Sequence, residues 1–142
     1  MLRGVVEVIA EEGNLTMIEA TCHCGAVRME IDHAPEDLTD CNCSLCRRLG
    51  GLWAYYRPEE VRRVSGATIA YVQGDRTLET HHCPTCGCTT HWQSLDPTYK
   101  RMGVNVRLMP PQVLTGVRVR KLDGANTWEV LGEYRFGAPT TG

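Results

Sequence analysis

The spacing of the cysteines constrains this chain more than any other feature of its sequence. Seven of the eight cysteines fall into a pair, a trio and a second pair: Cys22 and Cys24, then Cys41, Cys43 and Cys46, then Cys83 and Cys86. Such short spacings suit metal ligation better than bridges across a fold. Because the N-terminus shows no signal-peptide pattern, we expect a cytoplasmic protein with reduced thiols. Four disulfides in a secreted domain are the weaker alternative.

The two outer pairs predict one closed metal site. Side chains two apart on a strand face the same way, so a Cys-x-Cys pair can reach one ion. The Cys-x-x-Cys pair forms a tight knuckle, and the glycines Gly25 and Gly87 let the backbone turn away after each pair. One pair supplies two ligands, whereas tetrahedral zinc takes four. We therefore expect a structural zinc that pins two distant segments together, held by Cys22, Cys24, Cys83 and Cys86.

The trio predicts an open metal site, because three ligands leave a fourth position for water or substrate. Its sulfurs can face one ion if the end of a strand enters a helical turn. Three thiolates on a divalent ion give a net charge of about −1, which suits binding a substrate thiol as its thiolate better than making hydroxide. The expected chemistry is carbon–sulfur bond making or breaking. The alternative is a second closed site, with a fourth ligand from His81, His82 or Cys88.

Several other residues allow both a plain and a functional interpretation. The simplest interpretation of Cys88 is a small buried residue. Arg47 follows the trio directly and is either a solvated helix charge or a clamp on a substrate carboxylate. The aromatic residues near the clusters are expected in the core or in a cleft wall, and they are Trp53, Tyr55, Tyr56 and Trp92.

Short strands, turn signals and the absence of a long helical pattern predict a mainly β domain with short helical turns. We expect strands over residues 18–22, 26–31, 52–56, 68–73, 77–82, 89–93, 102–106 and 117–120. Residues 44–49 predict a short helix capped by Ser44 and ended by Gly50. Residues 5–9 fit either a strand or a helical turn. A net charge of −2 and the lack of a long apolar run argue against nucleic-acid and membrane partners.

The cysteine motifs resemble those of the glutathione-dependent formaldehyde-activating enzyme family, which also includes centromere protein V. The family pattern Cys-x-Cys-Gly, Cys-x-Cys-x-x-Cys-Arg and Cys-x-x-Cys-Gly has its match at Cys22–Gly25, Cys41–Arg47 and Cys83–Gly87. The resemblance spans residues 18–106 and implies a β-tent fold with two zinc ions. It implies that the outer pairs hold a structural zinc and the trio a catalytic one. The family reaction joins formaldehyde and glutathione to S-(hydroxymethyl)glutathione, as a carbon–sulfur lyase.

These inferences combine into one hypothesis. A zinc domain similar to that of the glutathione-dependent formaldehyde-activating enzymes (Gfa-like) is expected over residues 17–137. It lies between an N-terminal extension at 1–16 and a C-terminal tail at 138–142. We expect a zinc-dependent carbon–sulfur lyase-like enzyme that condenses a small aldehyde with a thiol such as glutathione, or the reverse. Its catalytic residues are expected to be Cys41, Cys43, Cys46 and Arg47. The alternatives are a non-catalytic zinc-stabilised binding module and a zinc-thiolate redox sensor. The sequence leaves open whether the chain forms a homo-oligomer.

Overall fold

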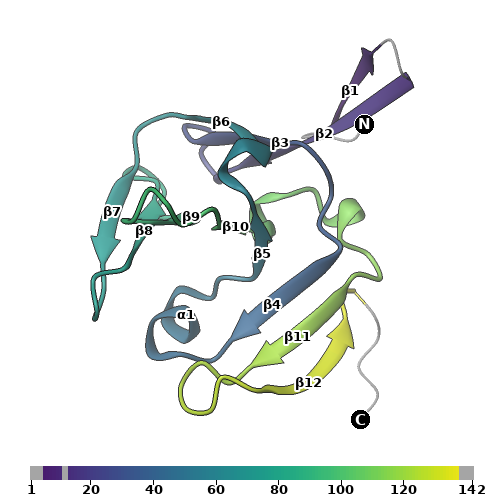
Figure 1. Cartoon of the computed structure of the whole chain (residues 1–142). Coiled ribbons are helices and arrows are strands. Elements are labelled where there is room, and N and C mark those ends of the chain that lie inside the picture. Colours follow the sequence, from purple (N-terminus) through teal and green to yellow (C-terminus); the bar gives the residue numbers. More distant parts are fainter. Residues whose placement is uncertain (1–4, 11–12, 138–142) are drawn as a thin grey trace.

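The computed structural model describes residues 5–10 and 13–137, and it contains two β-sheets (Figure 1). The smaller sheet has the strand order β1-β2-β3-β6 and is antiparallel throughout. Its strands are β1 (Val5–Ala10), β2 (Gly13–Thr21), β3 (Arg28–Ile31) and β6 (Val61–Ser65).

The larger sheet has eight strands in the order β12-β11-β4-β5-β10-β9-β8-β7. They are β4 (Asp37–Cys41), β5 (Trp53–Tyr56), β7 (Ile69–Val72), β8 (Leu78–His82), β9 (Thr89–Ser94), β10 (Met102–Asn105), β11 (Arg118–Leu122) and β12 (Val130–Arg135). The helical elements that connect the strands are short. They are α1 (Ser44–Leu49), η1 (Pro58–Glu60), η2 (Val106–Leu108) and η3 (Pro111–Val113).

One hydrophobic core joins the two sheets. In β3 the side chains alternate, so that Met29 and Ile31 are buried while Arg28 is exposed. They belong to one cluster with Leu38 and Val104 of the larger sheet. Burying this apolar surface on both sheets is the main favourable term that holds them together.

The larger sheet spreads into two wings, which position the site. In Figure 1, β7, β8 and β9 lie on the left, β4, β11 and β12 lie at the lower right, and β5 and β10 lie between them. The pairing of β4 with β11 is parallel, whereas the other pairings in this sheet are antiparallel. The parallel register sets Cys41 opposite Leu122, so the loop after β11 begins beside the trio.

The prediction of a mainly β fold with short helical turns is confirmed. Residues 5–9 belong to strand β1, which resolves the ambiguity in their pattern. Strands β4, β6 and β12 were not among the predicted strands. The proposed cap at Ser44 is wrong: the N-cap of α1 is Cys43, whose Sγ accepts a hydrogen bond from the N–H of Cys46. A thiolate can fill this role as a hydroxyl does, because it accepts hydrogen bonds from backbone N–H groups.

The domain boundaries stay predictions. Strand β2 runs without a break across the proposed boundary at residue 17. The proposed tail at 138–142 lies outside the described residues. In the part of the chain that the structure describes, no helix combines the length and the apolar character needed to cross a membrane.

Candidate active site

The structure brings the two outer cysteine pairs together into one four-sulfur cluster. The sulfurs of Cys22, Cys24, Cys83 and Cys86 all lie within 4.8 Å of one another. Cys24 lies 3.6 Å from both Cys22 and Cys83, sulfur to sulfur. Gly25 and Gly87 have φ angles of +83° and +80°, which glycine adopts without a steric penalty. The two turns can therefore fold back tightly enough for the four sulfurs to converge.

Backbone N–H groups prepare this cluster to carry negative charge. The N–H groups of Cys24 and Cys88 lower the pKa of the Cys86 thiol to about 5. The N–H of Cys86 likewise holds the pKa of Cys83 below its usual value. The N–H of Ala26 favours the thiolate of Cys24, but burial and the neighbouring thiols raise the pKa of Cys24 to about 11. One thiolate thus disfavours the next, which is the repulsion that a divalent cation would relieve. Four convergent soft donors fit a structural zinc.

The trio forms a second cluster, 41–46, at the junction of β4 and α1. Cys41 is the last residue of β4, Cys43 caps α1, and Cys46 lies in its first turn. Their three sulfurs lie within 4.8 Å of one another. Among the described residues, no further His, Cys, Asp or Glu ligand atom belongs to this group. The expected path from a strand end into a helical turn is what brings the three thiols together.

None of the suggested fourth ligands, Cys88, His81 and His82, belongs to the group of the trio. Cys88 packs against the four-sulfur cluster, which includes the buried Cys83. The His81 ring stacks on His91 with 4.3 Å between centroids, and its Nδ1 lies 2.8 Å from the Thr68 hydroxyl. All eight thiols are free, so the structure contains none of the disulfides of the secreted alternative.

The pKa values of the trio are split in the same way as those of the other cluster. Burial raises the pKa of Cys43, but the N–H of Cys46 and further hydrogen bonds outweigh it and lower the pKa overall. Burial raises the pKa of Cys41, and it raises that of Cys46 strongly. Cys43 is therefore the first thiol of the trio to ionise, and its charge disfavours the other two until a cation binds. Three thiolate donors fit zinc with a position left over.

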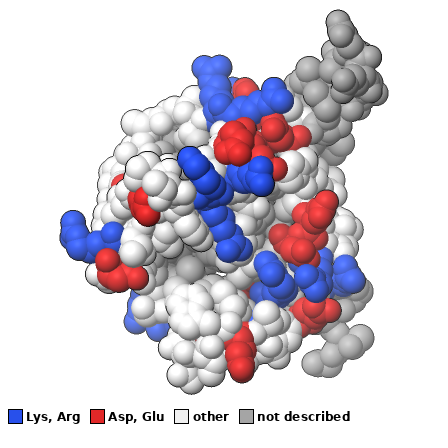
Figure 2. Space-filling view, in the orientation of Figure 1, with Lys and Arg blue, Asp and Glu red and all other residues white. Residues whose placement is uncertain are grey.

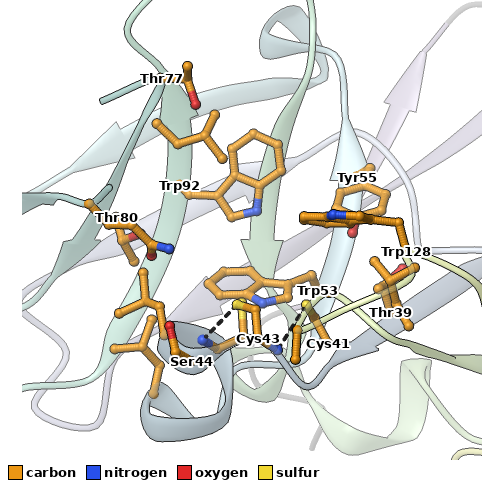
Figure 3. Close-up of a pocket in the computed structure, with 18 of the residues that line it drawn as sticks. Thr39, Cys41, Cys43, Ser44, Trp53, Tyr55, Thr77, Thr80, Trp92 and Trp128 are labelled. Carbon is orange, nitrogen blue, oxygen red and sulfur yellow. Dashed lines mark hydrogen bonds between the residues drawn. The ribbon is translucent and has the colours of Figure 1, made fainter. Parts of the chain in front are cut away.

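A cavity of about 800 Å³ opens above the trio, and residues of both wings line it. Figure 3 shows Trp53, Trp92 and Trp128 around one space above Cys41 and Cys43. The Trp92 ring lies on Gly103, where a Cβ would come within 2.0 Å of the indole nitrogen. The prediction that these aromatic residues lie in the core or in a cleft wall is confirmed: Trp53, Tyr55 and Trp92 line the cavity, and Tyr56 is a core residue.

Two arginines line this cavity, and the sequence analysis identified neither. The Arg101 guanidinium lies 4.0 Å from the centre of the Tyr55 ring, and Arg120 donates a hydrogen bond to the Thr39 hydroxyl at 3.0 Å. Arg47, the predicted clamp, is exposed in the last turn of α1 and is not among the residues that line the cavity. The surface shows no single-sign field on the face in Figure 2, where basic and acidic side chains are interspersed.

The loop at residues 123–129 covers the trio from the side of β11, and the sequence analysis overlooked it. Asp123 accepts hydrogen bonds from the Asn42 amide at 3.0 Å and from the Thr127 hydroxyl at 2.9 Å. Asn42 in turn accepts a bond from the N–H of Ala125 at 3.0 Å. These bonds fasten the loop to the segment that carries the trio. The run Asp-Gly-Ala-Asn at 123–126 is typical of a turn. It predicts the turn itself but not that the turn packs beside the trio.

Comparison with known proteins finds a matching family for most of the chain. The family model described as "Glutathione-dependent formaldehyde-activating enzyme" matches residues 17–113. No match is found among the curated proteins. The crystal structure of a Rhodobacter sphaeroides protein, a structural genomics target, is similar with a TM-score of 0.57 and 39% sequence identity. The match covers 64% of this chain and 86% of that one.

Proposed function

This chain belongs to the glutathione-dependent formaldehyde-activating enzyme family, and on that premise we propose that it is a zinc-dependent carbon–sulfur lyase-like enzyme. It joins a thiol such as glutathione to a small aldehyde such as formaldehyde, or runs the reverse reaction. The observation that carries the proposal is the three-thiol cluster at the base of a cavity of about 800 Å³. A structural metal site has no need of such a cavity, whereas a substrate does.

The proposal assigns one zinc ion to each cluster. The four-sulfur cluster has the donor count of a closed structural site, and the trio has that of a catalytic site. When bound to the trio, zinc would favour the thiolate form of an incoming thiol. The reduced thiols that this needs agree with a cytoplasmic location.

The chain's own residues have separate roles in the proposed reaction. A new bond forms between the thiolate sulfur and the aldehyde carbon, while the carbonyl oxygen takes up a proton. Tyr55 is the proposed proton donor, because it lines the cavity and burial raises its pKa, so its hydroxyl stays protonated at neutral pH. Water then returns a proton to Tyr55. The reverse direction runs through the same two proton transfers: Tyr55 first gives its proton to water, and the tyrosinate then takes the proton of the hydroxyl group. Trp53 and Trp92 exclude water from the reacting atoms.

A carboxylate of the thiol is the proposed partner of the arginines. Arg101 and Arg120 line the cavity, and both lie near Tyr55. The buried Nε of Arg120 has no hydrogen-bond partner among the described residues, so this guanidinium is not fully engaged by the protein itself. Arg47 remains the candidate from the sequence motif. A guanidinium matches a carboxylate in shape and charge, which makes either arginine of the cavity a suitable clamp.

Calorimetry of the zinc-loaded protein with glutathione tests the proposal. We expect binding with proton release, seen as a dependence of the heat on the ionisation enthalpy of the buffer. Cys43→Ser should lose binding while keeping the fold, because the other zinc still holds the structure. Arg101→Ala should weaken binding by roughly 1.5–3 kcal/mol if it holds the carboxylate, and Arg47→Ala is its matched comparison. If no thiol binds to protein with full zinc content, the enzyme proposal fails and the zinc-stabilised module takes its place.

A further inference from the structure

Trp128 is held in an unusual conformation at the edge of the cavity. Its φ angle is +61°, in the left-handed region that a bulky residue rarely adopts. Its side chain is 67% exposed, although it is a large aromatic residue. Backbone strain of this kind persists only where neighbouring contacts impose it, and it concentrates at functional sites.

The contacts that impose this conformation also fasten the loop to the trio. The N–H of Trp128 donates to the carbonyl of Asp123 at 2.8 Å, and the Asp123 side chain bonds to Asn42 and Thr127. Gly124 is packed so closely that a Cβ there would lie 2.4 Å from the Cys41 sulfur and 3.6 Å from the Trp128 ring. The Trp128 ring is thus placed beside the sulfurs, where a substituent on a bound thiol would lie.

Aromatic rings also line the other walls of the cavity. Trp53, Tyr55 and Trp92 present rings to the cavity, and aliphatic side chains such as Leu45 and Leu122 fill the spaces between them. Two of its hydroxyl groups already have partners: Thr39 accepts a bond from Arg120, and Thr77 donates to Asp75. The aromatic rings themselves offer no hydrogen bonds to the amide groups of a peptide-like ligand, whereas they can pack against an aromatic body.

The charges of the cavity favour an anion without an accompanying cation. Arg101 and Arg120 supply two positive charges near Tyr55. The one carboxylate among the lining residues, Asp75, lies in the turn between β7 and β8, where it accepts bonds from the N–H and the hydroxyl of Thr77. It is exposed and already engaged, so it is a weak site for the ammonium group of glutathione.

We propose that the preferred thiol of this site carries an aromatic body and a carboxylate but no ammonium group, with Trp128 as the residue that contacts the aromatic body. This inference rests on the proposed function, because it requires the trio to take up a thiol. It goes further in naming the chemical class of the thiol. The trio lies within the family match at 17–113, whereas Trp128 lies beyond it. The cysteines of the trio and the residue proposed to contact the aromatic body therefore lie in different segments.

Calorimetry with four thiols on the zinc-loaded full chain provides the test. They are 4-(mercaptomethyl)benzoate, benzyl mercaptan, 3-mercaptopropionate and glutathione. All four carry an alkyl thiol, so their sulfurs differ little in intrinsic affinity for a metal, and the comparison reports the rest of the molecule. We expect 4-(mercaptomethyl)benzoate to bind about tenfold more tightly than 3-mercaptopropionate, which is the upper range for one aromatic contact. It should also bind more tightly than glutathione and than benzyl mercaptan, which lacks the carboxylate.

Variants at position 128 assign the preference to one side chain. Trp128→Ala should close the gap between the aromatic acid and 3-mercaptopropionate, and Trp128→Phe should restore it. Tyr71→Ala is the matched control, because Tyr71 is an aromatic residue that is 56% exposed on β7 and does not line the cavity. Circular dichroism melting of each variant establishes that it is folded before its affinities are compared.

The outcomes separate this inference from the proposed function. If glutathione binds as tightly as the aromatic acid or more tightly, the inference is overturned and the proposed function stands. If no thiol binds to protein with full zinc content, the proposed function fails as well. If Trp128→Ala melts normally and still prefers the aromatic acid, the assignment of this preference to Trp128 is overturned.

Discussion

Replacing Gly124 by alanine should damage the trio while leaving the four-sulfur cluster intact. The new Cβ would lie 2.4 Å from the Cys41 sulfur and 3.3 Å from the Cys43 Cβ. Non-bonded heavy atoms approach comfortably only to about 3.5–4.0 Å, so either the loop or the Cys41 side chain must move by roughly 1 Å. Neither moves freely, because Asn42 bonds to Asp123 and to Ala125, each at 3.0 Å.

Overpacking of this kind typically costs about 1–3 kcal/mol. For a domain of this size, that corresponds to a fall in melting temperature of roughly 3–10 °C. The metal content should fall as well, from two zinc ions per chain towards one, because Cys41 is displaced from the geometry it shares with Cys43 and Cys46. Zinc released on denaturation, measured with a chromogenic chelator, and thermal melting followed by circular dichroism provide the two readouts.

Gly132→Ala is the matched control. Gly132 lies in β12, has no heavy atom within 4 Å of the position of a Cβ, and has a φ angle outside the left-handed region, as does Gly124. Both substitutions remove the same backbone freedom from the unfolded chain, so the difference between the two variants isolates the steric contact. Gly124→Ala with two zinc ions and the melting temperature of Gly132→Ala would refute the close packing of this loop on the trio.

Three further variants test the remaining assignments. Cys24→Ser should lower the melting temperature sharply and release one zinc, because structural zinc contributes directly to folding; unchanged melting with full metal content would remove the closed site. Cys88→Ala should keep both zinc ions and lose about 1 kcal/mol of stability at most, and the loss of one zinc would mean that Cys88 is a ligand. Burial and the nearby His81 lower the pKa of His91 to about 4, so the unfolded chain takes up this proton first as the pH falls. Stability should therefore fall by up to about 3 kcal/mol between pH 6.5 and pH 4, and urea unfolding of His91→Gln should show a shallower fall than that of the wild type. Equal slopes would contradict a neutral buried His91.

The part of the fold that the sequence predicts well is the part specified by neighbouring residues. Alternation in residues 26–31 indicates a half-buried strand, and Met29 and Ile31 are indeed buried. The short spacings of the cysteines limit where each sulfur can point, so both clusters follow from local geometry. The end of α1 is equally local, since Gly50 adopts the left-handed conformation with φ of +67° that a C-cap requires.

The part that the sequence does not predict depends on pairing between distant segments. Strand β11 joins β4 in a parallel register, and Arg118 contacts Asp37 across 81 positions of the chain. No periodicity within either segment reports this partner. Without the pairing, nothing in the sequence brings Arg120 or Trp128 to a cavity above the trio. The cysteine motif at 41–47 instead indicated Arg47. This residue follows Cys46 directly in the chain but is exposed in the structure.

The residues around the cavity fall into two segments, one inside the family match and one beyond it. Both cysteine clusters, together with Trp53, Tyr55, Trp92 and Arg101, lie within the family match at residues 17–113. The opposite wall of the cavity consists of residues 120–130, which lie beyond the match. The sulfurs of each cluster are brought together by local geometry, so short motifs predict them. The opposite wall depends on a strand that pairs beside β4 and a loop that reaches over Cys41, and no short motif indicates either. On the proposed function, the residues that hold the metal and the residue that contacts the aromatic body of the thiol therefore lie in different segments of the chain.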